Sequence, residues 1–209
     1  MQYKIFLKKE GDKYFERNKN KIYKKDHLFY EIKNAHRNKK INRLLEIGCG
    51  SGERLDLLNK ELNIKSYGVE PSKKAVDYIK KKFKKILIKR GTANNFVYKK
   101  INFDALVFGF CLYLVDINDY AKVFSETDRV TRKGSVIIIK DFFSDRFRTF
   151  PYKHHRKVFV NKYDFSKIFT WSPKFKLKKI KFFDHDDPFK KNIKKNNLVA
   201  LSVIEKIDD

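Results

Sequence analysis

The sequence predicts an α/β protein built on a Rossmann-like, mostly parallel sheet of seven strands with helices on both faces. Two observations predict this fold class. The apolar run at residues 44–47 breaks into alternating glycines and is followed by leucines at helical spacing, as in a buried strand, a tight loop and a helix. A second short strand, at 66–70, ends on the acid Glu70. Strands that alternate with helices in this way pair in parallel.

Length and composition favour one main domain. The chain has 209 residues, of which 42% are hydrophobic, enough for one sizeable core. We expect an N-terminal helical cap at residues 1–40 and a single domain at 41–209. The N-terminus lacks the apolar segment of a signal peptide, and the longest apolar run, 105–115, is shorter than the ~20 residues that cross a bilayer. We therefore expect a cytoplasmic protein without a membrane partner.

Charge and cysteine content narrow the function classes. The net charge is +25, but it comes from 40 Lys and only 10 Arg, spread from end to end. Because Arg is the side chain that binds phosphates and base edges in a fork, this favours a solvated surface over a nucleic-acid footprint. The two cysteines offer neither a disulfide framework nor metal-ligand spacing, so no metal is expected. The sequence does not indicate the oligomeric state.

The glycine loop after the first strand predicts a cofactor site. Gly48, Gly50 and Gly52 let the backbone turn sharply and approach a ligand, while the helix that begins near Glu53 directs free N–H groups at the same place. The spacing differs from the G-x-G-x-x-G fingerprint of dinucleotide-binding proteins, and the Gly-Lys-Ser/Thr end of a P-loop is absent. A different nucleotide-like cofactor is therefore expected.

Residues 46–52, which read E-I-G-C-G-S-G, closely resemble motif I of the class I S-adenosylmethionine-dependent methyltransferases. The resemblance implies S-adenosylmethionine as cofactor, methyl transfer as the activity, and an antiparallel hairpin at the C-terminal end of the sheet. It also implies that Glu46 lies near the methionine end of the cofactor and that Glu70 accepts hydrogen bonds from the ribose hydroxyls. The cofactor contacts predicted around these strand ends are Glu46, Gly48, Cys49, Gly50, Gly52, Glu70, Pro71, Thr92, Ala93 and Phe108.

A segment near the N-terminus adds to this resemblance. Residues 11–18, which read G-D-K-Y-F-E-R-N, look like the first helix of a set of small bacterial methyltransferases associated with surface-sugar biosynthesis. The resemblance implies that Tyr14, Arg17 and Asn18 close over the cofactor, with Arg17 paired to its carboxylate. The alternative is an ordinary amphipathic helix in which the aromatic residues only pack.

The remaining elements follow from apolar periodicity. We predict further strands at 86–88, 135–141, 175–183 and 198–204, a fourth strand with the loop at its carboxyl end within 103–113, and a helix at 118–131. The fourth strand is not followed by the Asp/Asn-Pro-Pro-Tyr/Phe element that methyltransferases acting on exocyclic base amines share. A base-amine methylase is therefore not favoured.

The long, aromatic and basic insertion at about 142–173 is expected to cap the acceptor side. Histidine can take up a proton near neutral pH, so His154 and His155 are the candidate bases. Asp141, at the end of a central strand, would orient such a histidine or bind an acceptor hydroxyl. The residues expected to contact the acceptor are Tyr113, Arg148, Arg156 and Tyr163.

Together these observations predict a methyltransferase that acts on an oxygen or nitrogen of a small acceptor, such as a sugar or a nucleotide sugar. Two alternatives stay open. The net charge would suit an RNA methyltransferase, and a catalytically inactive module that only binds the cofactor would carry the same motifs.

Overall fold

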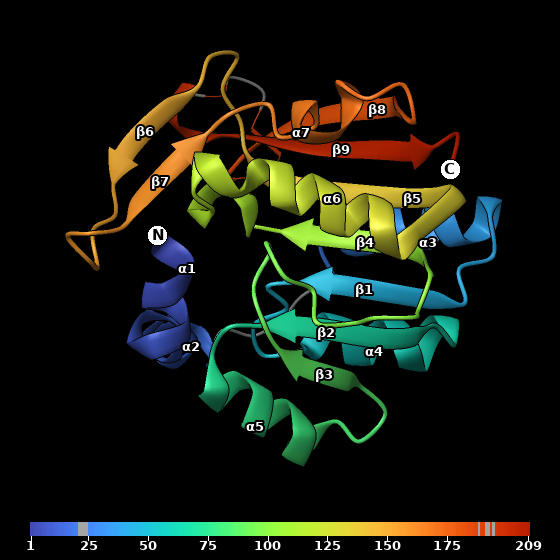
Figure 1. Ribbon diagram of the computed structural model, residues 1–209, viewed down its shortest axis with the longest axis horizontal. Helices are drawn as coiled ribbons and strands as arrows, with labels where there is room; N and C mark the ends of the chain where they lie inside the picture. Colours follow the sequence, from blue (N-terminus) through green and yellow to red (C-terminus); the bar gives the residue numbers. More distant parts are fainter. Residues whose placement is uncertain (21–24, 188, 191–192, 194) are drawn as a thin grey trace.

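The computed structural model describes residues 1–20, 25–187, 189–190, 193 and 195–209. Its main sheet has seven strands in the order β3-β2-β1-β4-β5-β9-β8 (Figure 1). Neighbours from β3 to β5 pair in parallel, whereas β9 pairs antiparallel with both β5 and β8. The predicted fold class is confirmed. The strands are β1 (Arg43–Ile47), β2 (Lys65–Glu70), β3 (Leu87–Arg90), β4 (Phe103–Gly109), β5 (Thr131–Phe142), β8 (Phe175–Asp184) and β9 (Leu198–Lys206).

Helices cover both faces of this sheet. One hydrophobic cluster buries Leu28, Leu55 and Ile79 against one face, and the other buries Val123 and Phe169 against the opposite face. Because the central strands are covered on both sides, they read as continuous apolar runs. The helices on the first face are α3 (His27–Asn38), α4 (Glu53–Leu62) and α5 (Lys73–Lys82); those on the second are α6 (Tyr120–Val130) and α7 (Lys167–Thr170).

The N-terminus forms a helical run at one end of the sheet. It consists of α1 (Gln2–Ile5), the π-helix η1 (Phe6–Glu10) and α2 (Gly11–Asn18), which follow one another without leaving helical backbone angles. Figure 1 shows this run beside the carboxyl ends of the parallel strands. A Cβ at Gly11 would lie 3.1 Å from the backbone nitrogen of Ser72, so the glycine lets α2 approach the start of α5.

The segment predicted as one long insertion contains a separate hairpin of β6 (Arg148–Pro151) and β7 (Phe159–Lys162). The hairpin lies at the same end of the sheet as the N-terminal run (Figure 1). The buried side chain of Gln2 joins the two, because its Nε2 donates to the Leu114 carbonyl over 2.9 Å and its Oε1 accepts from the Phe159 N–H. No helix formed by the described residues is long and apolar enough to cross a membrane.

Candidate functional site

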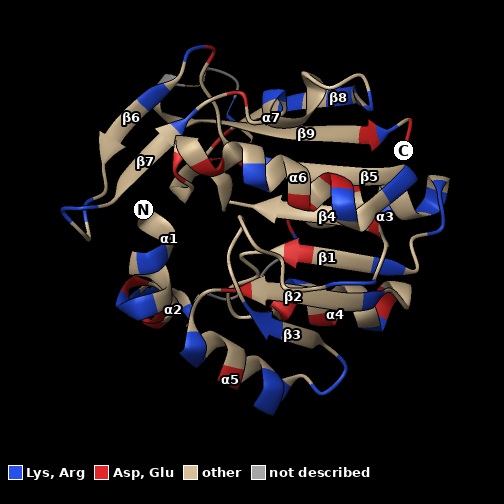
Figure 2. Ribbon diagram, in the orientation of Figure 1, with Lys and Arg blue, Asp and Glu red and all other residues tan. Residues whose placement is uncertain are grey.

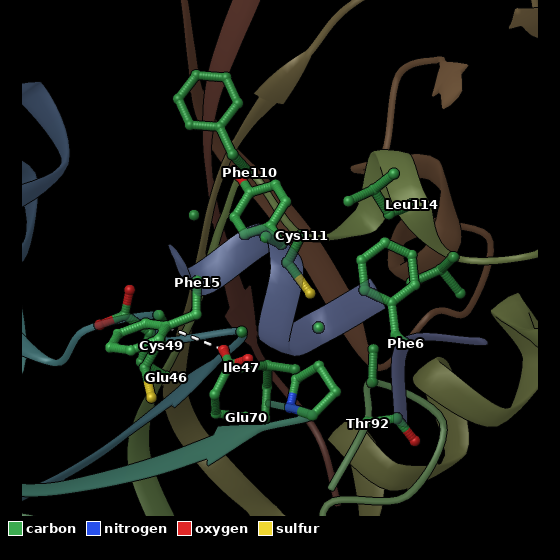
Figure 3. A pocket seen from close by; sticks show the side chains of 18 of the residues that line it. Phe6, Phe15, Glu46, Ile47, Cys49, Glu70, Thr92, Phe110, Cys111 and Leu114 are labelled. Carbon is green, nitrogen blue, oxygen red and sulfur yellow. Dashed lines mark hydrogen bonds between the residues drawn. The ribbon is translucent and has the colours of Figure 1, made fainter. Parts of the chain in front are cut away.

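A cavity of about 310 Å³ lies at the carboxyl ends of β1, β2 and β4. Open α/β sheets bind their ligands at this place. In Figure 3, Glu46 and Glu70 lie on one side of the cavity, and Phe6 and Leu114 lie across from Glu46. The N-terminal helical run supplies part of the wall, so segments far apart in the sequence enclose one site.

The glycine loop has the conformation that its spacing predicts. Gly48, Gly50 and Gly52 all have positive φ, of 71°, 57° and 81°, which residues with a side chain rarely adopt. A Cβ built at Gly50 has no atom within 4 Å, so the loop leaves open space there. A Cβ at Gly52 would lie 2.9 Å from Cγ1 of Ile79 and would push α4 away from α5. The two glycines therefore serve different purposes.

Glu46 lies at the end of β1 and is almost fully buried. Its Oε1 is ion-paired with Arg54, whereas its Oε2 has no hydrogen-bond partner within the described part of the chain. Burial raises the pKa of the Glu46 carboxyl, and Arg54 opposes this. A buried carboxylate oxygen without a donor is unfavourable, so a ligand N–H in the cavity would stabilise it.

Glu70 ends β2 and faces the glycine loop. Its Oε2 accepts from the Gly50 N–H and its Oε1 from the Ser72 N–H, both over 3.0 Å. Burial raises the pKa of this carboxyl to about 7, although both hydrogen bonds act in the opposite direction. Because two carboxylate oxygens offer about four acceptor positions, the group retains capacity for ligand hydroxyls.

Asp141 is not part of the cavity lining but supports the loop after β4, which contributes to the cavity wall. Its Oδ2 accepts from the backbone N–H groups of Cys111, Leu112 and Tyr113 over 3.1, 2.8 and 3.2 Å, and its Oδ1 accepts from that of Phe142 over 2.8 Å. Burial raises its pKa to about 7 against these four hydrogen bonds. Asp141 thus holds the loop after β4 in place and contacts no histidine, which differs from the role expected from the sequence.

Most of the residues predicted to contact the cofactor line the cavity. Phe108 does not, because it is fully buried and packs against Phe96 and Phe169 in the core. Gly52 acts through packing, as described above. The predicted residues that line the cavity are Tyr14, Asn18, Glu46, Gly48, Cys49, Gly50, Glu70, Pro71, Thr92 and Ala93.

Arg17 takes a different partner from the one expected. Its Nη2 lies 2.6 Å from Oε1 of Glu10 and donates to the Tyr152 hydroxyl over 3.0 Å. The guanidinium therefore fastens the N-terminal run to the hairpin and is not part of the cavity lining. Glu10 is nearly fully buried, and a buried carboxylate without a partner is strongly unfavourable, so it forms an ion pair with the nearby Arg17.

The two candidate histidines lie outside the cavity. His154 is exposed, with its ring 5.2 Å from that of Tyr152, and His155 belongs to the turn between β6 and β7. Arg148 and Arg156 are exposed on the hairpin. The structure therefore does not bring these four residues to the cavity.

The two predicted acceptor tyrosines are also placed apart. Tyr113 is buried, and its hydroxyl is hydrogen-bonded to that of Tyr14, which lines the cavity. Tyr163 packs against Phe147 and Phe165 and is not part of the lining.

Sequence patterns did not indicate several lining residues. Arg54, in the first turn of α4, supports Glu46, and its position directly after the glycine loop was the available signal. Phe110 has a φ of 53°, unusual for a residue with a side chain, and no sequence pattern marks it. Asp116 and Asp119 reach the cavity from the turns before α6.

The comparisons with known proteins agree with this geometry. The family described as methyltransferase domain matches residues 45–139, which run from β1 into β5. Residues 45–139 are thus similar to a methyltransferase domain. A domain of this family binds S-adenosylmethionine. No curated protein matches the chain in sequence.

Solved structures share the fold of the methyltransferase domain and most of the remaining chain. A SAM-dependent methyltransferase from Methanosarcina mazei is 16% identical, with 86% of this chain and 98% of that chain covered and a TM-score of 0.67. The N-methyltransferase NodS from Bradyrhizobium japonicum, in complex with S-adenosyl-L-homocysteine, is 12% identical, with 94% and 98% covered and a TM-score of 0.66.

A third similar structure contains both a cofactor product and an acceptor. It is the 1,6-didemethyltoxoflavin-N1-methyltransferase from Burkholderia thailandensis, with bound 1,6-didemethyltoxoflavin and S-adenosylhomocysteine. It is 14% identical, with 88% of this chain and 78% of that chain covered and a TM-score of 0.65. At sequence identities this low, the similarity to these structures shows a shared fold and does not extend to their acceptors.

Proposed function

We propose that the chain transfers the methyl group of S-adenosylmethionine to an oxygen or nitrogen of a small acceptor, such as a sugar or a nucleotide sugar. One observation carries the proposal. One cavity at the strand ends contains the open space beside Gly50, the carboxylate of Glu70, and Oε2 of Glu46, for which the described residues offer no hydrogen-bond partner.

These residues fit the cofactor by chemistry. The bound cofactor supplies a sulfonium-activated methyl group. Glu46 accepts from its ammonium group, because Oε2 is the carboxylate oxygen that lacks a donor. Glu70 accepts from the ribose hydroxyls, and Thr92 and Ala93 border the adenine. Tyr14 and Asn18 on the N-terminal run cover the cofactor, which gives this part of residues 1–40 the role of a cap.

The charges of the cavity support a small acceptor rather than RNA. Although the chain has a net charge of +25, acidic residues outnumber basic ones in the cavity lining. An acidic cavity favours a cationic cofactor and repels a phosphate backbone. The charged lining residues are Lys19, Glu46, Glu53, Arg54, Glu70, Asp116 and Asp119.

The rate of methyl transfer depends mainly on how the cofactor and the acceptor are aligned. Methyl transfer is an in-line displacement, so holding the two partners in line provides much of the rate, and a base is needed only when the acceptor is a hydroxyl. Burial raises the pKa of Tyr14, so its hydroxyl stays protonated and serves as a donor in the cavity. An amine acceptor fits these groups without a histidine base.

Calorimetric titration with S-adenosylhomocysteine tests the cofactor roles. Glu46→Gln and Glu70→Ala should each weaken binding by about 10- to 100-fold, since hydrogen bonds to charged groups contribute about 1.5–3 kcal/mol. Glu61→Gln is the matched control, because Glu61 pairs with Lys25 on the surface. Absence of binding to the unmodified protein, or full binding by both variants, would contradict the proposal.

An acceptor panel with methyl-labelled cofactor tests the acceptor class. The panel contains sugars, nucleotide sugars, small amines and short oligoribonucleotides. Labelling of a small molecule is the expected result. Labelling of the oligoribonucleotides alone would replace the proposal with an RNA methyltransferase. Cofactor binding without labelling of any acceptor would favour an inactive binding module.

A further inference from the structure

One face of the hairpin combines cations with an aromatic ring. In the β6–β7 register, Arg148 lies opposite Lys162, and Phe150 lies opposite Val160. Because alternate residues of a strand share a face, Arg148, Phe150 and Lys162 belong to the same face. The Nζ atom of Lys162 lies 5.6 Å from the centre of the Phe150 ring, as this arrangement requires.

Contacts between side chains connect this face to the cavity. Nζ of Lys162 also lies 4.9 Å from the centre of the Phe142 ring, at the end of β5. The Phe142 and Phe110 rings are 5.4 Å apart, and Phe110 lines the cavity. We call Arg148, Phe150, Lys162, Phe142 and Phe110 the hairpin track. It leads from the exposed hairpin to the cofactor cavity.

Within the part of the chain that the structure describes, no carboxylate forms an ion pair with the two cations of the track. Residues 146–163 contain six Lys or Arg and no Asp or Glu. In Figure 2, Lys and Arg lie toward both ends of the hairpin. Two lysines that are buried elsewhere, Lys140 and Lys206, pair with carboxylates. Lys162 is partly buried, but its ammonium donates to the Asn196 carbonyl, and no carboxylate of the described residues pairs with it.

Burial lowers the pKa of Lys162, and no carboxylate among the described residues offsets this effect. An ammonium group in this situation is stabilised by an anion that arrives from solution. Arg148, on the opposite strand, adds a planar fork that suits phosphate oxygens. The exposed ring of Phe150, two residues along β6 from Arg148, offers a surface on which a planar base can stack.

We propose that the hairpin track binds the nucleoside diphosphate portion of the acceptor, so that the acceptor of this methyltransferase is nucleotide-linked. The inference rests on the proposed function and names the substrate class of the same site. The two cations on this face match the charge of one diphosphate, whereas an RNA strand would require a longer row of cations. Phe142 and Phe110 then lead the group attached to the diphosphate toward the cavity.

Calorimetry with nucleoside diphosphates tests the track directly. UDP, CDP, ADP and GDP are titrated separately into the full chain saturated with S-adenosylhomocysteine, and at least one should bind. Arg148→Gln, Lys162→Gln and Phe150→Leu should each weaken that binding about tenfold or more, given the usual strength of charged hydrogen bonds and base stacking. Lys162→Arg, which keeps the charge, should restore most of it.

The controls separate the track from general charge effects. Lys153→Gln and Lys176→Gln remove exposed lysines from the hairpin turn and from β8, and should leave diphosphate binding unchanged. All variants should bind S-adenosylhomocysteine with the affinity of the unmodified chain, which also reports on their folding. If the unmodified chain does not bind S-adenosylhomocysteine, the result contradicts the proposed function. It differs from the result that contradicts the track, in which S-adenosylhomocysteine binds and the diphosphates do not.

Three outcomes would overturn the inference. The first is that no nucleoside diphosphate binds, or that the track variants bind it as well as the unmodified chain. The second is that inorganic pyrophosphate binds as tightly as any nucleoside diphosphate, since the aromatic rings would then add nothing. The third is that a ten-nucleotide oligouridylate binds in a track-dependent manner while the diphosphates do not, which would assign the surface to RNA.

Discussion

The carboxylate of Glu46 lies at one end of a row of side chains with alternating negative and positive charge. Arg54 contacts Glu46 and lies 3.9 Å from Asp26, and Asp26 also pairs with Lys140 over 2.9 Å. Asp26 in turn caps α3, accepting from the N–H of Phe29. The orientation of the glutamate in the cofactor cavity is therefore set by residues from three separate elements.

The affinity for S-adenosylhomocysteine should rise with pH. Burial raises the pKa of Glu70 to about 7, so its carboxyl is largely protonated at about pH 6, whereas accepting from two ribose hydroxyls favours the ionised form. Binding should tighten up to about tenfold per pH unit below the pKa and level off above it. Calorimetry at pH 6, 7 and 8 measures this, and Glu70→Gln should remove the dependence. A pH-independent dissociation constant for the unmodified chain would contradict it.

The same pKa predicts the opposite trend for stability without cofactor. The folded pKa of Glu70 lies above the ordinary value of 4.5, so the folded state binds the proton more tightly than the unfolded state. The stabilisation is complete below about pH 4.5 and is lost as pH rises through 7. In the unmodified chain this carboxyl should lower the free energy of unfolding by up to about 3 kcal/mol between pH 5 and pH 8, and Glu70→Gln should remove that part of the pH dependence. The amide of the variant would also present its NH₂ to the Gly50 or the Ser72 N–H, so the comparison is made between pH values and not between absolute stabilities. Urea titrations at both pH values test this difference.

Asp141→Asn should destabilise the protein. The carboxylate accepts from four backbone N–H groups, and an amide would present its own NH₂ to some of these donors. We expect a loss of about 2–4 kcal/mol in the free energy of unfolding, together with weaker S-adenosylhomocysteine binding because the cavity wall loosens. Asp145→Asn, at an exposed position, is the control. Equal urea midpoints for the two variants would contradict this role of Asp141.

Residues whose position in the cavity follows from motif spacing could be predicted from the sequence. Residues whose position depends on which of several partners they contact in the fold could not. Glu46 and Glu70 follow from the glycine motif and a strand end. Arg17 is near Glu10, and only the fold decides that this buried acid takes the guanidinium. Phe108 belongs to a continuously apolar strand, in which no alternation reveals the face of each side chain.

We expect two glycines of the loop to have different roles: Gly50 leaves room for the cofactor, and Gly52 lets α4 pack close to α5. Two substitutions test this difference. Gly50→Ala should cost only the ~1–2 kcal/mol of a left-handed residue, because its Cβ meets open space, while it weakens S-adenosylhomocysteine binding at least tenfold. Gly52→Ala should lose more stability, because its Cβ approaches Ile79. Thermal unfolding and calorimetry on both variants decide, and reversed rankings would contradict the assignment.

Other element boundaries reflect contacts that are distant in sequence. β5 begins at Thr131, earlier than the predicted residue 135, because Thr131 pairs with Phe103 of β4. The hairpin is held at the cavity by Gln2, which accepts from an N–H group 157 residues away. Local periodicity contains no information about such a contact, so the sequence predicted a long insertion but not the hairpin within it.

At the scale of the whole molecule, a net charge of +25 should make stability sensitive to salt. Like charges repel in the compact state, and salt screens this repulsion over about 10 Å at 0.1 M. Raising the NaCl concentration from about 0.05 M to about 0.3 M should therefore increase the melting temperature by a few degrees. Scanning calorimetry measures it, with KCl as a control for ion identity. A lower melting temperature in salt would mean that attractive ion pairs dominate.

The sheet could be predicted well from sequence at this scale because each parallel strand is a short apolar run followed by a helix. The order of its last two strands could not be obtained from periodicity, which says nothing about which strand lies outermost. The family resemblance implied an antiparallel hairpin at this end of the sheet, and in the structure β9 lies between β5 and β8.

The position of β9 has a consequence during protein synthesis. β8 leaves the ribosome before β9, yet its pairing in the sheet is with β9. Until residues 198–206 have emerged, the nascent chain therefore keeps the outer edge of β5 uncovered and β8 without its neighbour. Such an edge is a natural docking place for a chaperone that escorts the unfinished polypeptide.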